Sequence, residues 1–187
     1  MKHIIEKYLI TLNHAFSSSI QDDINELAKA LMLAWRNDKN IYLCGNGGSA
    51  GNAVHVANDL LYGAGIANGQ GLKVEALSAN PAVLTCLAND LGYEHIYSEQ
   101  INVKGSEGDL LIALSGSGKS PNIIKAIEAA AKKGMETFAI LGFDGGACKL
   151  KASHVIHFHV NDMQIAEDLQ LIVLHMCMKF LSQKKLS

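Results

Sequence analysis

Two loops rich in glycine and serine have the composition of an anion-binding site. They are Cys44–Gly51 and Ser115–Asn122, and each follows a short apolar run typical of a strand. A helical pattern begins directly after each loop, so backbone N–H groups at both helix starts could point at an anion. In the second loop, Ser120 has the position of an N-cap and Pro121 that of the first helical residue. Three serine hydroxyls therefore crowd one helix start.

The alternative is that both loops are only tight strand-to-helix turns, for which glycine and serine are ordinary residues. One such loop would carry no information about function. Two loops at the carboxyl ends of strands in one open sheet converge where ligands bind in doubly wound folds. The pair of loops therefore favours an anion site.

Two nucleotide-binding motifs are matched only in part. The segment Gly45–Ala50 fits a dinucleotide fingerprint, but that motif needs an acidic residue at the end of the second strand. The second strand predicted here, Leu72–Leu77, runs out in Ala76-Leu77-Ser78 and holds Glu75 in its interior. The segment Gly118–Ser120 supplies the tail of a P-loop, but Ala113 stands where its first glycine is required and a proline follows directly.

The elements around these loops predict an α/β fold, a three-layer αβα sandwich. Apolar runs rich in β-forming residues alternate with helical patterns, which indicates a parallel sheet covered by helices on both faces. The predicted strands are Ile41–Cys44, Leu72–Leu77, Asp109–Leu114, Thr137–Leu141 and Val155–Val160. Two amphipathic segments, Ile4–Phe16 and Asp22–Trp35, predict extra N-terminal helices. No linker divides the chain, so we expect residues 1–187 to form a single domain.

Composition argues against several classes of partner. The chain has 187 residues, of which 49% are hydrophobic, with 16 Lys+Arg against 18 Asp+Glu. Without a basic excess we expect no nucleic acid partner. No apolar run is long enough to span a bilayer, and the four scattered cysteines form no CxxC pair. We therefore expect no membrane partner and a cytoplasmic location with reduced thiols.

The last helical segment, about Met163–Leu181, is apolar on more than one side. A helix that is apolar all round must be buried, and burial against another subunit is a natural solution for a terminal helix in a small domain. We therefore predict a homo-oligomer.

With these residues in view, the chain resembles the SIS (sugar isomerase) domain family, and within it the phosphoheptose isomerases, which interconvert sedoheptulose 7-phosphate and a heptose phosphate. The segments that carry the resemblance are Cys44–Ser49, Ala88–Asp90, Leu114–Ser120, Gly142–Gly146 and a final helix with His175. The resemblance implies a flavodoxin-like, five-stranded parallel sheet and a homotetramer with active sites at subunit interfaces. It also implies an intramolecular oxidoreductase that supplies heptose for lipopolysaccharide or capsule biosynthesis.

The resemblance assigns the sugar phosphate contacts residue by residue. Four serines match the phosphate-binding hydroxyls of the family, an asparagine matches a loop residue of the sugar site, and one aspartate falls where the family has a substrate-contacting acid. With the adjoining loop glycines, these are Asn46, Gly47, Gly48, Ser49, Asp90, Ser115, Gly116, Ser117 and Ser120.

Four side chains of metal-ligand type lie on two predicted helices. His55 and Asp59 are four residues apart and share a face, and Glu167 and His175 are eight apart and share another. The resemblance implies that these four positions bind zinc and that Asp59 and His175 are also the catalytic acid/base pair. The chain departs from the family here, because Asp59 replaces Glu and Glu167 replaces Gln. It also has Gly63 in place of an Arg, and Gly116 in place of a Thr.

An aldose–ketose isomerisation would suit these side chains. It shifts a proton between C1 and C2 through an enediolate, so it needs a base, an acid and a group that stabilises the oxyanion. Asp59 could be the base, His175 the acid, and zinc or the loop N–H groups the stabilising group. The alternative is that His55 and His175 only pack at a subunit interface, with Asp59 and Glu167 solvated or paired.

Two further alternatives stay open on the sequence. The chain could be a non-catalytic SIS module that binds a phosphosugar or a protein partner, which the changes at Asp59, Glu167 and Gly63 motivate. A second histidine cluster, His154-x-x-His157-x-His159, is interpreted as a partly exposed terminal strand, although a metal there is also consistent with the pattern.

Overall fold

A central sheet of five parallel strands confirms the predicted fold class. The computed structural model describes residues 1–16, 18–66 and 69–185. The strands are β1 (Asn40–Gly45), β2 (Lys73–Ala76), β3 (Leu110–Ser115), β4 (Glu136–Leu141) and β5 (His154–His157). Their order is β2-β1-β3-β4-β5, the flavodoxin-like arrangement. The chain therefore reverses its direction of strand addition between β1 and β3, where ligands bind in such folds.

The fifth strand is shorter than predicted. It ends at His157, whereas the apolar pattern continues to Val160. The backbone N–H of Val160 bonds to the carbonyl of Phe158, a tight turn that interrupts the regular pairing with β4. The apolar residues of this segment therefore extend beyond the last residue of β5.

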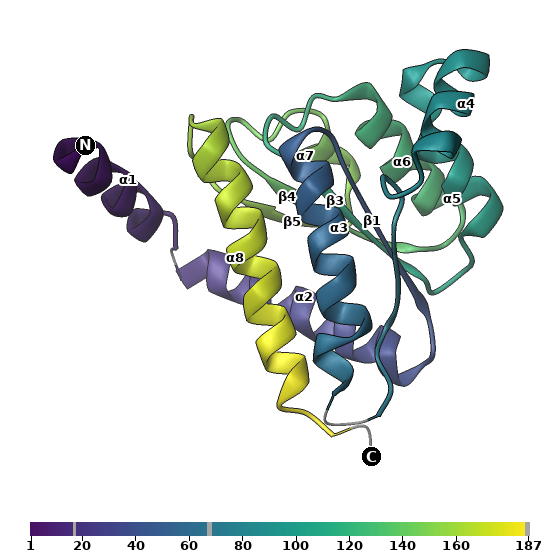
Figure 1. Cartoon of the computed structure of the whole chain (residues 1–187), viewed down its shortest axis with the longest axis horizontal. Coiled ribbons are helices and arrows are strands. Elements are labelled where there is room, and N and C mark those ends of the chain that lie inside the picture. The colour runs from purple at the N-terminus through teal and green to yellow at the C-terminus, as the bar shows by residue number, and fades with distance from the viewer. Residues whose placement is uncertain (17, 67–68, 186–187) are drawn as a thin grey trace.

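Helices cover both faces of the sheet (Figure 1). Helices α2, α3 and α8 share one hydrophobic core with the sheet, and α5 and α6 share the other. Alternate strand residues face the two cores, so that Ile41 and Leu43 of β1 point to the first and Tyr42 and Cys44 to the second. The helices are α1 (Lys2–His14), α2 (Ser18–Arg36), α3 (Gly48–Leu61), α4 (Pro81–Leu91), α5 (Ser98–Lys104), α6 (Pro121–Lys132), α7 (Cys148–Lys151) and α8 (Met163–Ser182), with short 3-10 turns η1 (Gly63–Gly65) and η2 (Tyr93–His95).

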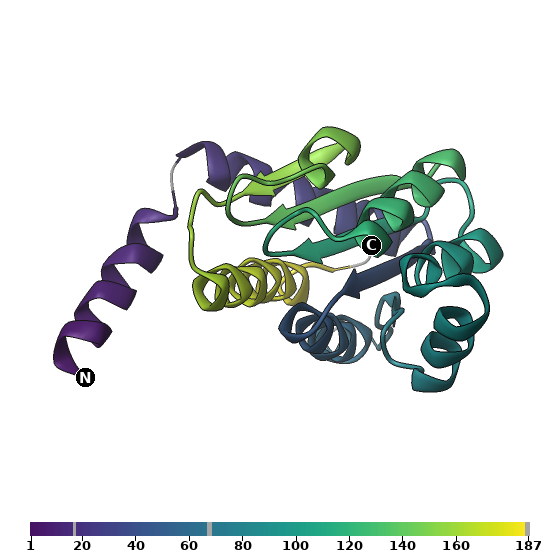
Figure 2. The same cartoon turned by 90° about the horizontal axis from the view of Figure 1, so that it is seen from above.

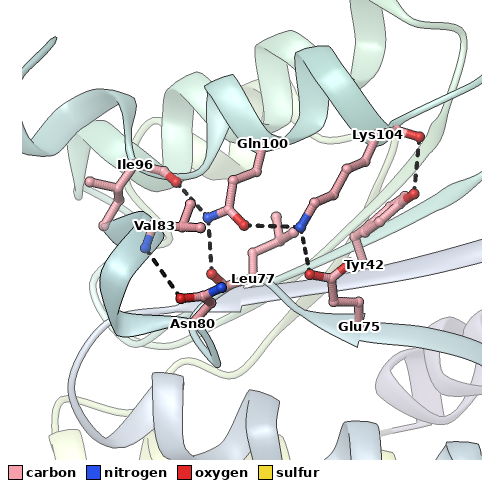
Figure 3. Close-up of polar contacts among 8 residues, drawn as sticks. All are labelled: Tyr42, Glu75, Leu77, Asn80, Val83, Ile96, Gln100 and Lys104. Carbon is pink, nitrogen blue, oxygen red and sulfur yellow. Dashed lines mark hydrogen bonds and ion pairs between the residues drawn. The ribbon is translucent and has the colours of Figure 1, made fainter. Parts of the chain in front are cut away.

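Polar contacts fix the segment that leaves β2 (Figure 3). The amide of Gln100 donates to the carbonyl of Leu77, and the side chain of Asn80 accepts from the first turn of α4. Glu75, inside β2, forms an ion pair with Lys104. Because this carboxylate already has a structural partner and does not end the strand, the structure gives no support to the dinucleotide alternative.

Helix α1 extends away from the body of the molecule (Figures 1 and 2). The hydroxyl of Tyr8 on α1 donates a hydrogen bond to the carboxylate of Asp168 at 2.6 Å. Burial and that acceptor raise the pKa of Tyr8 to about 12. None of its described residues is buried, and its exposed apolar side chains include Ile4, Ile5, Leu9 and Ile10. The amphipathic pattern thus predicted a helix correctly, but the chain covers only part of its apolar face, at Tyr8 and Leu12.

Helix α8 is buried on one side only. Leu169 and Leu174 are fully buried in the core, but Met176 is 41% exposed. Within the described residues, no helix is both long and apolar enough to cross a membrane. The four cysteines form no disulfide among the described residues.

Candidate active site

The first loop joins β1 to α3 by a turn that requires glycine. Gly47 precedes α3 with φ +55°, a left-handed conformation that favours glycine. A Cβ on Gly45 would lie 2.6 Å from the backbone of Ser49, so the turn is also too tight for a side chain there. The buried hydroxyl of Tyr97 donates to the carbonyl of Gly45. Close packing and this hydrogen bond therefore fix the turn that leads from β1 into α3.

The second loop places three hydroxyls beside α6. The buried Ser115 hydroxyl accepts from the N–H of Gly118 at 3.0 Å, and the Ser117 hydroxyl accepts from the N–H of Lys119 at 3.2 Å. Ser120 has the N-cap position, as predicted, but its side chain makes no capping hydrogen bond. Its hydroxyl is therefore available to a ligand at the helix start.

A third loop, Gly142–Gly146, packs against the second loop. The N–H of Cys148 donates to the carbonyl of Gly118 at 3.0 Å, and Lys119 pairs with Asp144 at 2.7 Å. This lysine holds the pKa of the Asp144 carboxyl below its usual range. Lys119 therefore has an exposed partner on the neighbouring loop, unlike a P-loop lysine, which reaches bound phosphates.

We expect Gly118→Ala to lower the free energy of unfolding by about 2–5 kcal/mol, because the new methyl group meets both strain and overlap. Gly118 has φ +65°, and its Cβ would overlap the carbonyl of Gly145. Urea denaturation measures the change. Gly51→Ala is the matched control, since Gly51 lies in α3 with nothing near its Cβ position and should keep or gain stability. Equal midpoints for the two variants would contradict the close packing of the loops.

A reciprocal amide pair ties the two anion loops together. Nδ2 of Asn46 donates to Oδ1 of Asn122 at 2.9 Å, and Nδ2 of Asn122 donates to Oδ1 of Asn46 at 2.8 Å. The hydroxyl of Tyr93 donates to the same Asn46 oxygen at 3.1 Å. Asn122 is 1% exposed, whereas Asn46 is partly exposed at the cavity. Sequence reasoning assigned a role to Asn46 alone and missed both Asn122 and Tyr93.

Asn122→Ala should weaken binding of a phosphate ligand about fivefold or more, because it leaves Asn46 without its partner and frees the loops to separate. Titration of inorganic phosphate by calorimetry measures the effect. Asn102→Ala, on the exposed side of α5, removes an amide that contacts only Glu99 and should change nothing. If both variants bound phosphate like the wild type, the amide pair would have no part in shaping the site.

The two loops enclose a cavity of about 260 Å³ at the carboxyl ends of β1 and β3. In the register of these strands, Cys44 lies opposite Ala113, and Gly45 lies opposite Leu114, so both loops begin at the same level. The cavity is lined by Asn46, Gly47, Ser49, Leu114, Ser115, Gly116, Ser117, Ser120, Met163 and Glu167. The structure therefore brings together seven of the nine residues assigned to sugar phosphate binding.

The other two assigned residues lie outside this lining. Gly48 is the first residue of α3 and touches the carboxylate of Glu167 at the cavity. Asp90 lies on α4, where its carboxylate accepts from the amide of Asn89 at 2.8 Å and contacts the thiol of Cys86. A substrate contact by Asp90 stays a prediction.

Three of the four predicted metal ligands converge further along α3 and α8. Nε2 of His55 lies 2.9 Å from Nε2 of His175, and Oδ2 of Asp59 lies 3.4 Å from each. A tetrahedral ion with bonds of about 2.1 Å separates its ligand atoms by roughly 3.4 Å. These side chains are thus spaced as a group that could hold a metal ion.

Glu167, the fourth predicted ligand, is outside this group. It lies on α8 at the level of Gly48, where a Cβ built on the glycine would overlap its carboxylate. Eight residues of helix separate it from His175, about 12 Å along the axis. The structure therefore places Glu167 at the loop cavity and His175 at the metal group.

The seam between α3 and α8 connects these two places. The helices lie side by side in Figure 1, and the amide of Asn52 donates to the carbonyl of Glu167 at 2.9 Å and to Oε1 of Gln170 at 3.1 Å. Seven residues of α3 separate Gly48 from His55, about 10 Å along the axis. The loop cavity and the metal group therefore lie about 10 Å apart along the seam.

The second histidine cluster lies only partly on the predicted terminal strand, because His154 and His157 belong to the edge strand β5 and His159 lies beyond its end. His157 is buried, with Nε2 at 3.0 Å from the carbonyl of Phe143 and its ring 4.0 Å from that of His159. Burial lowers the pKa of His157, which favours the neutral ring. His154 pairs with Glu136 at 2.9 Å. Among the residues that the structure describes, this cluster does not form a metal-binding group.

The fold and the site define a doubly wound α/β protein with a hydroxyl-lined cavity at the switch point of its parallel sheet and a histidine–carboxylate group on two packed helices beside it. The SIS domain family model matches residues 6–142. The phosphoheptose isomerase of Helicobacter pylori is 32% identical over 175 residues, covering 92% of this chain and 91% of that protein. The chain belongs to the SIS domain family, and within it to the phosphoheptose isomerases.

Other relatives agree with this membership. The phosphoheptose isomerase of Chlorobaculum parvum is 40% identical over 144 residues, covering 76% of this chain and 68% of that protein. The solved structure of phosphoheptose isomerase from Neisseria gonorrhoeae superposes with a TM-score of 0.90 at 25% identity, covering 98% of this chain and 97% of that one. The similarity therefore extends over the sheet, both loops and the two helices of the seam.

Proposed function

We propose that this chain isomerises sedoheptulose 7-phosphate to a heptose 7-phosphate, an aldose, for the synthesis of surface polysaccharide. The observation that carries the proposal is the arrangement of the loop cavity and the His55–Asp59–His175 group at two ends of one seam. One end suits a phosphate, and the other holds groups that can move protons next to a carbonyl. Membership in the phosphoheptose isomerases supports the same substrate.

The length of the seam favours a seven-carbon substrate. Six C–C bonds of about 1.5 Å in an extended zigzag span roughly 8 Å, and the phosphate ester adds about 2 Å. The total is close to the roughly 10 Å between the start of α3 and His55. A five-carbon sugar phosphate held at the loops would leave its carbonyl two bonds short of the histidines.

At the loop end, hydroxyls and backbone N–H groups would hold the phosphate. Ser49 lies in the first turn of α3 and Ser120 is the N-cap of α6, so both hydroxyls lie at helix starts, where the helix dipole also favours an anion. Ser117 lies between them on the second loop and lines the same cavity. Hydrogen bonds to a charged phosphate are about twice as strong as neutral ones.

At the other end, the spacing of His55, Asp59 and His175 fits a zinc ion with three protein ligands and one position for substrate. Bound zinc would polarise the sugar carbonyl and stabilise negative charge on its oxygen. Zinc is proposed because the two imidazoles and one carboxylate are the ligand types of catalytic zinc sites.

The residues of this group would carry the proton transfers. Asp59 removes a proton from C1 of the ketose and returns it to C2, which converts the ketose to the aldose through an enediolate. His175 moves a proton between the two substrate oxygens, O1 and O2. His175 and Asp59 come from different helices, and Nε2 of His175 lies 3.4 Å from Oδ2 of Asp59, so both groups would act at the same end of the substrate.

We also propose that α1 assembles the chain into a homo-oligomer, with the tetramer implied by the resemblance as the expected form. Exposed Ile5 and Leu9 lie four residues apart on one face of α1, with Ile10 beside them. Exposed apolar patches of this kind mark interaction surfaces, and a second copy carries the same patch.

The double variant Ile5→Asp, Leu9→Asp should reduce the molar mass in solution to that of a smaller assembly, because it puts charge into the apolar contact. Light scattering coupled to gel filtration measures the mass. The control Lys2→Asp, Lys7→Asp changes the charge of the same helix by a larger amount but leaves its apolar residues. A wild-type chain that elutes as a monomer would contradict the assembly.

Activity on a panel of sugar phosphates with five, six and seven carbons tests the proposed function. Protein purified without chelator should convert sedoheptulose 7-phosphate to an aldose and contain about one zinc per chain. Removal of the metal should reduce the rate, and zinc should restore it. Inactivity on the whole panel would overturn the proposal, and tight binding without turnover would identify a binding module instead.

A further inference from the structure

The side chain of Glu167 lies in the cavity that the proposed function assigns to phosphate. It lines the cavity beside Ser49 and the second loop. Its carboxylate rests against Gly48 so closely that any Cβ at that position would overlap it. The lack of a side chain at position 48 therefore allows a carboxylate to approach the first turn of α3.

The carboxylate has no other partner that explains this position. Among the described residues, no ion pair or hydrogen bond to its side-chain oxygens is found, and the hydrogen bond from Asn52 goes to the backbone carbonyl of Glu167. The start of α3 carries free N–H groups and the positive end of the helix dipole. This negative side chain therefore lies where the structure attracts an anion.

We infer that Glu167 is an internal competitor for the phosphate site, whose carboxylate must leave the start of α3 before a phosphate can bind there. The inference rests on the proposed function, because it takes the loop cavity as the phosphate end of the site. A phosphate carries one to two negative charges, and a second negative group in the same cavity of about 260 Å³ repels it. Glu167 and phosphate therefore do not occupy the start of α3 together.

Competition between the Glu167 carboxylate and phosphate determines which ligands can bind in the loop cavity. Inorganic phosphate has only the loop contacts with which to displace the carboxylate. A long sugar phosphate also reaches His55, Asp59 and His175 along the seam, and these additional contacts offset the displacement. Glu167 thus keeps the affinity for inorganic phosphate low while the sugar phosphate still binds.

Glu167→Gln tests the inference, with calorimetric titration of inorganic phosphate as the readout. The amide keeps the shape of the side chain but removes the charge, so phosphate should bind about tenfold or more tightly. A damaged site would bind more weakly, so a gain in affinity does not arise from damage. The matched control is Asp168→Asn, the next residue of α8, which removes the same charge outside the cavity and should bind phosphate like the wild type.

Ser120→Ala in each background separates this inference from the proposed function. Tighter phosphate binding in Glu167→Gln alone, weakened by Ser120→Ala, would support the inference. Equal binding in the wild type and Glu167→Gln, still weakened by Ser120→Ala, would overturn it and leave the phosphate site in place. An equal gain in Asp168→Asn would also overturn it, since net charge would then be the cause. Phosphate binding that does not respond to Ser120→Ala would overturn both.

Discussion

Asp59→Asn should lower kcat for the conversion of sedoheptulose 7-phosphate by about 10²- to 10⁴-fold, the usual contribution of a general base. The amide keeps the size of the side chain but cannot accept the proton from C1. Because the phosphate end lies about 10 Å away, affinity for inorganic phosphate should be unchanged. Conversion is measured by aldose formation, and phosphate affinity by calorimetry.

The control for this variant is Asp22→Asn, which removes an exposed carboxylate on α2. It should leave both kcat and phosphate affinity at wild-type values. An Asp59→Asn enzyme with nearly full kcat would contradict the role of Asp59. A loss of phosphate affinity as large as the loss of kcat would show that the two ends of the site are not independent.

Ser120→Ala should raise KM for the sugar phosphate about 10- to 100-fold with a much smaller change in kcat. The reason is that it removes one hydrogen bond to a charged group, which contributes about 1.5–3 kcal/mol to binding. Since the Ser120 hydroxyl makes no capping hydrogen bond, the melting temperature should stay within a degree or so. Steady-state kinetics and thermal unfolding measure the two effects.

Ser106→Ala is the matched control, because this serine lies on an exposed turn before β3 and away from the loop cavity. Its KM should equal that of the wild type. If Ser120→Ala lowered the melting temperature and left KM unchanged, Ser120 would be a structural cap and not a phosphate ligand.

The sequence was sufficient to predict the sheet and the meeting of the two loops. Alternating strand and helix patterns require parallel strands, and parallel strands place their carboxyl ends at one edge. Cys44 and Ala113 indeed lie opposite each other in β1 and β3. The spacing of His55 and Asp59 likewise predicted a shared helical face, which their convergence on one group confirms.

The sequence did not predict contacts that depend on how elements are placed along one another. Glu167 and His175 share a face of α8, but only the packing of α8 on α3 decides that Glu167 lies level with Gly48 and His175 level with His55. The pairing of Asn46 with Asn122 was missed for the same reason, since the burial of Asn122 arises from two loops that meet only in the folded chain.

The most direct test of the account is a crystal structure with a bound seven-carbon sugar phosphate, prepared with the inactive Asp59→Asn variant. We expect the phosphate between Ser49 and Ser120, Glu167 turned away from Gly48, and C1 and C2 of the sugar beside His55 and His175. A phosphate bound outside the loop cavity, or a sugar that leaves the cavity away from the α3–α8 seam, would contradict the proposal that the two ends form one site.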